Sequence, residues 1–321
     1  MTTTEGPSAE LRRQLETLST EARRPDHAEI DRLPTLDLAR TMNEGDAEVP
    51  AAISAALPAI ASAIDAIAER MGGGGRLVYA GAGTAGRMGV LDASECPPTF
   101  NTAPEQVIGL IAGGEQAIRT AVEGAEDDAA RAAADLDALG LGPQDVVVGI
   151  SASGRTPYAV AAVEHARSAG ALTVGLACNA GSALGAAAEH ALEIETGPEL
   201  VSGSTRLKAG TAQKLVLNMI STITMIRLGK TYGNLMVDLR STNEKLRVRS
   251  RRIVALATGA PEPQIEKALA ATGGEVKDAI LMILSGVGAA DAADLLAEAR
   301  GHLRAALEAA PNGAGPALSG D

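Results

Sequence analysis

The sequence predicts an α/β protein in which a parallel sheet carries helices on both faces, followed by a small helical bundle. Short apolar runs alternate with helical stretches through the middle of the 321-residue chain, which is typical of a parallel sheet covered on both sides. After about residue 250, the apolar residues recur only at helical spacing. The length suits two domains, or one large domain with an appendage.

The expected elements follow in order along the chain. A helical stretch at 28–42, broken by Pro34, precedes a long amphipathic helix at 49–71, which the glycines at 72–75 end. Strands are expected at 76–80, 107–111, 145–150, 172–176 and 192–195, and helices at 116–139, 158–168 and 211–228. Short helices at 253–257, 263–271 and 276–284 then lead to a longer helix at 289–309.

These elements divide the chain into four parts. They are a helical segment at 1–60, the sheet domain at 61–229, a helical region at 230–310 and a tail at 311–321 that we expect to be disordered. The first 20 or so residues are polar, and we expect them to be frayed.

Charge and aromatic content argue against nucleic acid as a partner. The chain has 28 Lys and Arg against 40 Asp and Glu, a net charge of −12, whereas binding to a phosphate backbone needs a basic surface. One Phe, three Tyr and no Trp are too few for a platform that stacks single-stranded bases. The site of an anionic ligand must therefore be local, built from backbone amides and a few cations.

The remaining composition indicates a soluble, cytoplasmic protein without a metal. Cys96 and Cys178 lack CxxC spacing, as expected of a reduced compartment. The N-terminus has no signal-peptide run, and the apolar stretches at 51–68 and 215–226 are interrupted by proline or polar residues, so we expect no membrane partner. The four histidines show no metal-ligand spacing, and we expect neither metal nor cofactor.

The first glycine-rich loop, at 81–86, follows a strand and has the GxGxxG pattern of dinucleotide-binding sites. That pattern needs an acid about 20 residues further on, but Glu115, at the end of the second strand, lies well beyond that distance. A turn that brings Gly83 and Thr84 close to a phosphate or a sugar is therefore the favoured interpretation, and NAD the less favoured one.

Two further loops offer hydroxyl groups to an anion. The loop at 151–157 carries Ser151, Ser153 and Thr156 at a strand–helix turn, where hydroxyl and N–H groups can donate to a phosphate; an N-capping turn is the alternative. The loop at 201–211 carries Ser202, Ser204 and Lys208, and alone it could be a solvated loop. Three such loops at strand ends favour a sugar phosphate over a dinucleotide.

Two glutamates are candidate acid and base groups. Glu95 lies in 92–99, where Pro97 restricts the preceding backbone and predicts a rigid turn. Glu126 lies on or near a helix in the acidic run at 123–128, for which a solvated acidic face is the plainer interpretation. Their separation in sequence does not show that they meet.

At these residues the sequence resembles the N-acetylmuramic acid 6-phosphate etherases. The motifs that carry the resemblance lie at 30–33, 81–84, 91–99, 113–114, 123–127, 153–157, 208–214, 233–238 and 242–246. Each is short, but their order and spacing extend over most of the chain, from about residue 19 to 300. The resemblance implies a sugar isomerase (SIS) domain with a flavodoxin-like sheet, a small C-terminal helical region and a homodimer.

The resemblance also implies the reaction and two site residues. The family cleaves D-lactate from N-acetylmuramic acid 6-phosphate in cell-wall sugar recycling, leaving N-acetylglucosamine 6-phosphate. Its acid maps onto Glu95 and its second active-site glutamate onto Glu126. One departure is Ala85, where the family commonly has Ser. Elimination explains a need for two carboxylates, because one group must remove the C2 proton of the open-chain aldehyde and another must protonate the leaving oxygen. Which glutamate takes the C2 proton stays open.

Two other functions remain as alternatives. An aldose–ketose isomerase on the same scaffold would transfer the C2 proton without elimination. A sugar-phosphate sensor, similar to the glucokinase regulatory protein, would need only the hydroxyl loops. The presence of both glutamate motifs favours the enzyme.

Overall fold

The computed structural model describes residues 17–239 and 244–311. The chain divides into two compact units, one made of residues up to 94 together with 104–221, the other of 95–103 together with the residues from 222 onward.

The first unit is built on a five-stranded parallel sheet, which confirms the predicted fold class. Its strands are β1 (Leu77–Gly81), β2 (Val107–Ile111), β3 (Val146–Ser151), β4 (Leu172–Ala177) and β5 (His190–Glu193), in the order β2-β1-β3-β4-β5. All five expected strands are present, the fifth shifted by two residues towards the N-terminus. Gly81 is in register with both Ile111 and Ile150, so the carboxyl ends of β2, β1 and β3 lie side by side.

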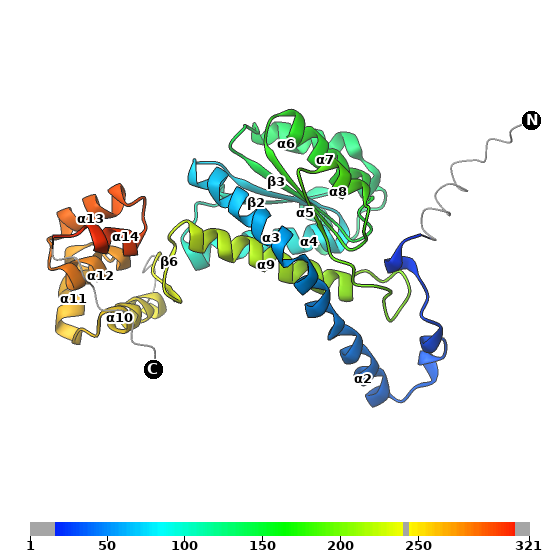
Figure 1. The fold of residues 1–321 in the computed structure, drawn as a ribbon, viewed down its shortest axis with the longest axis horizontal. Coiled ribbons are helices and arrows are strands. Elements are labelled where there is room, and N and C mark those ends of the chain that lie inside the picture. Colours follow the sequence, from blue (N-terminus) through cyan, green and yellow to red (C-terminus); the bar gives the residue numbers. More distant parts are fainter. Residues whose placement is uncertain (1–16, 240–243, 312–321) are drawn as a thin grey trace, which may run out of the picture. The chain divides into compact units, whose positions relative to one another are not determined.

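Helices cover both faces of this sheet (Figure 1). One face carries α3 (Glu48–Gly72) and α9 (Lys208–Arg227), the other α6 (Ala129–Leu139), α7 (Pro157–Ser168) and α8 (Ala183–Ala187). Strands β1, β3 and β4 are buried at every position and are therefore mostly apolar. Val78 and Val147 join the core beneath α6 and α7, which includes Leu136 and Tyr158.

The structure corrects two predicted helices, which are broken by left-handed backbone. The helix expected at 116–139 is divided into α5 (Gly114–Arg119), the 3-10 turn η4 (Ala125–Asp127) and α6, with Gly124 at φ 72°. The helix expected at 289–309 is divided into α13 (Ala289–Glu298) and α14 (Leu303–Ala309), because Arg300 and Gly301 have φ of 52° and 79°. Apolar spacing continues through both breaks, so periodicity alone does not reveal them.

The prediction of a rigid turn around Glu95 is also wrong. Residues 92–99 lie inside α4 (Gly83–Phe100), which includes Pro97 and Pro98. Each proline removes one backbone hydrogen bond, but the Asn101 N–H still donates to the Pro97 carbonyl at 3.0 Å. Cys96 and Phe100, one helical turn apart, are both buried, and their burial offsets the lost bonds.

The described end of the N-terminal segment is held in place, so the expectation of fraying is wrong for residues 17–20. Residues 1–16 lie outside the described residues, but Leu18 and Thr20 are buried. The Asn179 side chain, after β4, accepts a hydrogen bond from Ser19 Oγ at 2.9 Å and donates one to Thr20 Oγ1 at 3.0 Å. Long-range contacts to Asn179 hold this short segment, and its own composition does not show them.

The segment then continues through α2 (Thr35–Asp46) into α3, which passes the expected boundary at residue 60 without a break. By length and composition the helical stretch 35–72 could cross a membrane, but this is weak evidence, because core helices of soluble proteins meet the same criteria. Ile53, Ile60 and Ile67 on α3 are buried within the unit.

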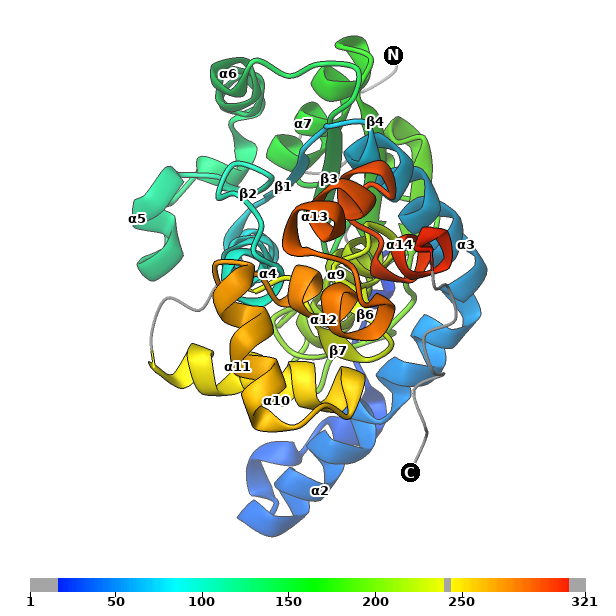
Figure 2. The same ribbon diagram turned by 90° about the vertical axis from the view of Figure 1, so that its left-hand side faces the viewer.

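The second unit combines a hairpin with a helical bundle, seen from the side in Figure 2. Its elements are β6 (Thr231–Tyr232), β7 (Leu235–Met236), α10 (Glu244–Thr258), α11 (Glu262–Ala271), α12 (Val276–Ser285), α13 and α14. Val254, Ile265 and Ile280 lie in its core. Beside them, Asp238 binds Lys230 at 2.7 Å and Lys277 at 3.1 Å. The expected disordered tail lies outside the described residues, apart from residue 311.

Candidate functional site

The strand order places a switch point at the carboxyl edge of the sheet. From β1 the chain crosses to β2 on one side and later returns to β3 on the other. Ligands of such sheets bind outside the carboxyl ends of the strands, where the strand order reverses. The loops that follow β1, β2 and β3 meet here, and the first two hydroxyl loops predicted from the sequence are among them.

The loop after β3 forms a compact cluster of hydroxyl groups. Ser151 Oγ lies 2.8 Å from Thr156 Oγ1 and 3.2 Å from Ser153 Oγ, and it accepts the Gly154 N–H at 3.0 Å. Ser151 is 2% exposed, whereas Ser153 and Thr156 are half-buried. The three predicted hydroxyls are thus brought together at the start of α7, with the two half-buried ones in contact with a buried centre.

The loop after β1 turns directly into α4. A side chain at Gly81 would lie 2.9 Å from the Gly86 backbone nitrogen, so the tight turn requires glycine there. Thr84 lies against the first turn of α9, where a methyl group at Gly210 would be 3.4 Å from its Cγ2. The loop therefore approaches α9 closely. Because β1 pairs directly with β3, the loop after β1 and the hydroxyl cluster after β3 start one strand spacing apart, roughly 5 Å.

A pocket of about 230 Å³ opens beside the ends of β1 and β2. Its walls come from the turn after β1, from the residues after β2 and from the loop that joins α5 to α6; they are Ala82, Gly83, Arg87, Ala112, Ala117, Ala121, Val122, Glu123, Gly124, Ala125 and Glu126. Two predicted site residues, Gly83 and Glu126, therefore share one pocket. Glu126 reaches it because Gly124 ends the preceding segment and starts η4.

Sequence reasoning missed Arg87, the cation of this pocket. Arg87 lies in the second turn of α4 and is half-buried. Its Nε donates to the Ile118 carbonyl at 3.0 Å, which links α4 to α5. A lone arginine one turn beyond a glycine-rich loop has no distinguishing spacing, so only the fold identifies it.

Glu95, the other predicted acid, is an exposed residue of α4 in the segment that belongs to the second unit. Its catalytic role stays a prediction. Three residues earlier, Asp92 is 9% exposed and receives hydrogen bonds from Tyr79 Oη at 2.8 Å and Ser221 Oγ at 3.1 Å. Desolvation raises the pKa of Asp92 to about 6, although these two hydrogen bonds oppose the rise.

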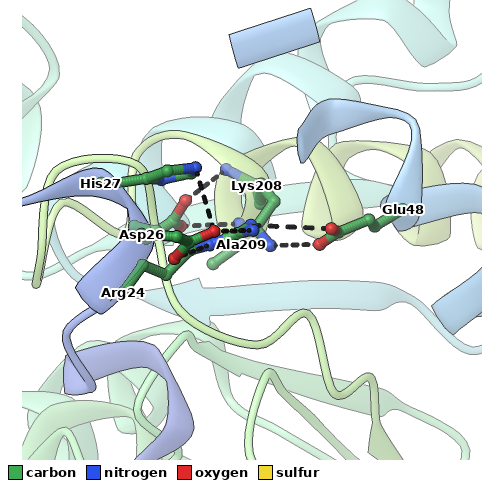
Figure 3. A network of polar contacts seen from close by, with 7 residues as sticks. Arg24, Asp26, His27, Glu48, Lys208 and Ala209 are labelled. Atoms are coloured by element: carbon green, nitrogen blue, oxygen red, sulfur yellow. Dashed lines mark hydrogen bonds and ion pairs between the residues drawn. The ribbon is translucent and has the colours of Figure 1, made fainter. Parts of the chain in front are cut away.

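The third predicted loop engages the N-terminal segment (Figure 3). Ser202 Oγ donates to the Glu21 carbonyl at 3.0 Å. Lys208 is buried, and its Nζ donates to Glu48 at 2.7 Å, which holds the pKa of that carboxyl below its ordinary value. Arg24 lies 3.6 Å from the same carboxylate. Phosphate binding by Ser202, Ser204 or Lys208 stays a prediction.

A second buried carboxylate occupies the start of α9. Glu199 is 1% exposed and accepts the N–H groups of Lys208 and Ala209 at 2.9 and 3.0 Å. It thus fills the position that an anion prefers at a helix N-terminus. In 17–239 and 244–311, no group of three or more His, Cys, Asp or Glu side chains is arranged to hold a metal ion.

Comparison with known proteins identifies the class of this fold. Residues 59–167 match the family described as the glucokinase regulatory protein N-terminal SIS domain, and residues 128–223 match the SIS domain family. The chain therefore contains a SIS domain. Among solved structures, a phosphoheptose isomerase from Francisella tularensis is 22% identical, with a TM-score of 0.46, covering 60% of this chain and 100% of that one.

Curated relatives define the family more closely. N-acetylmuramic acid 6-phosphate etherase from Streptomyces coelicolor is 73% identical over 94% of this chain and 97% of its own length. The etherases of Rubrobacter xylanophilus and Mycolicibacterium smegmatis are 59% and 53% identical, covering 90% and 92% of this chain and 96% and 99% of their own lengths. The chain belongs to the N-acetylmuramic acid 6-phosphate etherase family.

Proposed function

We propose that this enzyme cleaves the D-lactyl ether of N-acetylmuramic acid 6-phosphate, giving N-acetylglucosamine 6-phosphate and D-lactate. Identities of 53–73% to etherases over nearly the whole chain support this activity. The structural observation behind it is the pairing, at one sheet edge, of a hydroxyl cluster suited to a phosphate with a pocket lined by Glu126.

The hydroxyl cluster would hold the substrate phosphate. Ser153 and Thr156 are half-buried and lie around the buried Ser151, and hydroxyl and N–H donors at a helix start suit phosphate oxygens. Gly83 and Thr84 would approach the sugar from the loop after β1. A sugar anchored in this way extends across the end of β1 towards Glu126.

The reaction would proceed by β-elimination and hydration. In the open-chain aldehyde, a carboxylate removes the C2 proton, the C2–C3 double bond forms and the C3–oxygen bond breaks. The departing lactate oxygen takes a proton from a carboxylic acid. Water then adds its oxygen to C3, while a proton returns to C2. We assign the acid to Glu95 and the second acid or base role to Glu126; a positioned group of this kind contributes about 10²–10⁴-fold to the rate.

We further infer a cytoplasmic homodimer that acts in the recycling of cell-wall amino sugars. The absence of a CxxC pair and the acidic composition support a reduced, soluble setting. The sugar phosphate is the small-molecule partner, and neither metal nor cofactor is needed for the proton transfers described.

One assay tests the activity directly. The purified protein is incubated with N-acetylmuramic acid 6-phosphate, and D-lactate release is followed with and without EDTA. We expect lactate release that EDTA leaves unchanged. No lactate above background would refute the activity; a ketose product would indicate an isomerase, and binding without turnover a sensor.

The role of Glu126 has its own test. Glu126→Gln should lower kcat by 10²-fold or more and leave KM close to that of the unaltered enzyme. Glu115→Gln is the matched control, because Glu115 is also exposed but lies on α5 outside the pocket. Equal rates for the two variants would remove Glu126 from the mechanism.

A further inference from the structure

We propose that Arg87 binds the carboxylate of the lactyl group, and so selects substrates that carry an acidic ether substituent. This inference rests on the proposed etherase function and assigns a specificity-determining residue to its site.

The Arg87 guanidinium is fixed in place and keeps donors available. Its Nε donates to the Ile118 carbonyl at 3.0 Å, which orients the planar group from α4. Among the residues that the structure describes, neither of its two Nη groups has a hydrogen-bond or ion-pair partner. A guanidinium oriented in this way matches the two oxygens of a carboxylate.

The pocket that Arg87 lines suits a small acid with an apolar side. Five of its eleven lining residues are alanines, and Val122 adds a further apolar side chain. At no more than roughly 30 Å³ for each water-sized group, the six non-hydrogen atoms of an ether-linked lactyl group fit within the pocket of about 230 Å³.

Charge makes Arg87 necessary for an anion to enter this pocket. Glu123 and Glu126 line the same walls, and two carboxylates would repel a third. Arg87 offsets that repulsion locally, in a protein whose net charge is −12. After elimination, free D-lactate would leave a pocket that still contains both glutamates.

The two substrate anions would thus have separate sites. The phosphate meets the hydroxyl loop after β3, which has its own cation in Arg155, with a buried Nε that has no partner among the described residues. Lys208 is committed to Glu48. For the lactyl carboxylate, Arg87 is the cation that lines the pocket containing Glu126.

The test compares Arg87→Met and Arg87→Lys with Arg119→Met. Arg119 is an exposed arginine on α5 that does not line the pocket. Lactate release from N-acetylmuramic acid 6-phosphate is measured together with competitive inhibition by N-acetylglucosamine 6-phosphate, which has the phosphate but no lactyl group. We expect Arg87→Met to lower kcat/KM about ten- to a hundredfold, as for a lost charge-assisted hydrogen bond. The inhibition constant of N-acetylglucosamine 6-phosphate should change by no more than about twofold in Arg87→Met. The kcat/KM of Arg87→Lys should be intermediate, and that of Arg119→Met should equal the value of the unaltered enzyme.

A change in the substrate keeps the inference testable if the Arg87 variants fold poorly. The unaltered enzyme should discriminate about ten- to a hundredfold against a substrate whose lactyl carboxylate is converted to the amide, and a folded Arg87→Met should lose that discrimination. Equal use of acid and amide by the unaltered enzyme would overturn the inference, as would an equal loss of inhibitor binding in Arg87→Met. Absence of lactate release by the unaltered enzyme would refute the proposed function itself, whereas normal release by Arg87→Met would refute only the role of Arg87.

Discussion

Replacing Asp92 with asparagine should stabilise the protein at neutral pH and have little effect in acid. Asp92 lies on α4 against β1 and α9, 9% exposed, where it accepts hydrogen bonds from Tyr79 and Ser221. Desolvation disfavours its charged form and raises its pKa to about 6, from the ordinary 3.8. Asparagine has nearly the same shape and can keep a hydrogen bond without the buried charge.

The magnitude follows from the two pKa values. The folded state holds the Asp92 proton more tightly than the unfolded state, so its contribution to stability is fully present below pH 3.8 and is lost as the pH rises through about 6. The difference corresponds to about 3 kcal/mol. Asp92→Asn removes this loss. Between pH 4 and pH 7, the free energy of unfolding of the variant should therefore rise relative to that of the natural protein by up to about 3 kcal/mol.

The assay is urea unfolding of both proteins from pH 4 to pH 7.5. Asp145→Asn is the control, because it removes a buried carboxylate with the opposite shift. Desolvation raises the pKa of Asp145. Hydrogen bonds from the Arg76 guanidinium and from the backbone N–H groups of Arg76 and Gly142 lower that pKa by more, so the net shift is a decrease. That variant should be less stable at pH 7, with the deficit shrinking in acid. A stability difference for Asp92→Asn that does not change with pH would refute the reasoning.

Two further variants test other parts of the first unit. Ser153→Ala should raise KM for the phosphorylated substrate about tenfold with little change in kcat or Tm, because Ser153 is a half-buried member of the hydroxyl cluster; an unchanged KM would count against this loop as the phosphate site. Glu199→Gln should destabilise the protein by about 1–3 kcal/mol, measured by urea unfolding, since the buried carboxylate accepts two N–H groups at the start of α9. Unaltered stability would show that the neutral side-chain amide of the glutamine variant satisfies these N–H groups as well as the carboxylate does.

Local signals in the sequence were enough to place the strands and the hydroxyl cluster. Strands β1 to β4 consist mostly of apolar residues, and the hydroxyl residues of 151–156 begin at the last residue of β3. A serine at that position must lie at the carboxyl edge of the sheet, so its placement needs no long-range information. The helical breaks at 120–128 and 299–302 escaped because apolar spacing continues across them.

What the sequence alone determined is therefore the parallel sheet, the hydroxyl cluster and, through short motifs, the resemblance to etherases. The tertiary structure alone decided which charges have partners. It placed Arg87 in one pocket with Glu126, committed Lys208 to Glu48 and put Glu199 at the start of α9. The physical reason is range: strand and turn propensities act between neighbouring residues, whereas an ion pair or a pocket joins residues that only the completed fold brings within a few ångströms of each other.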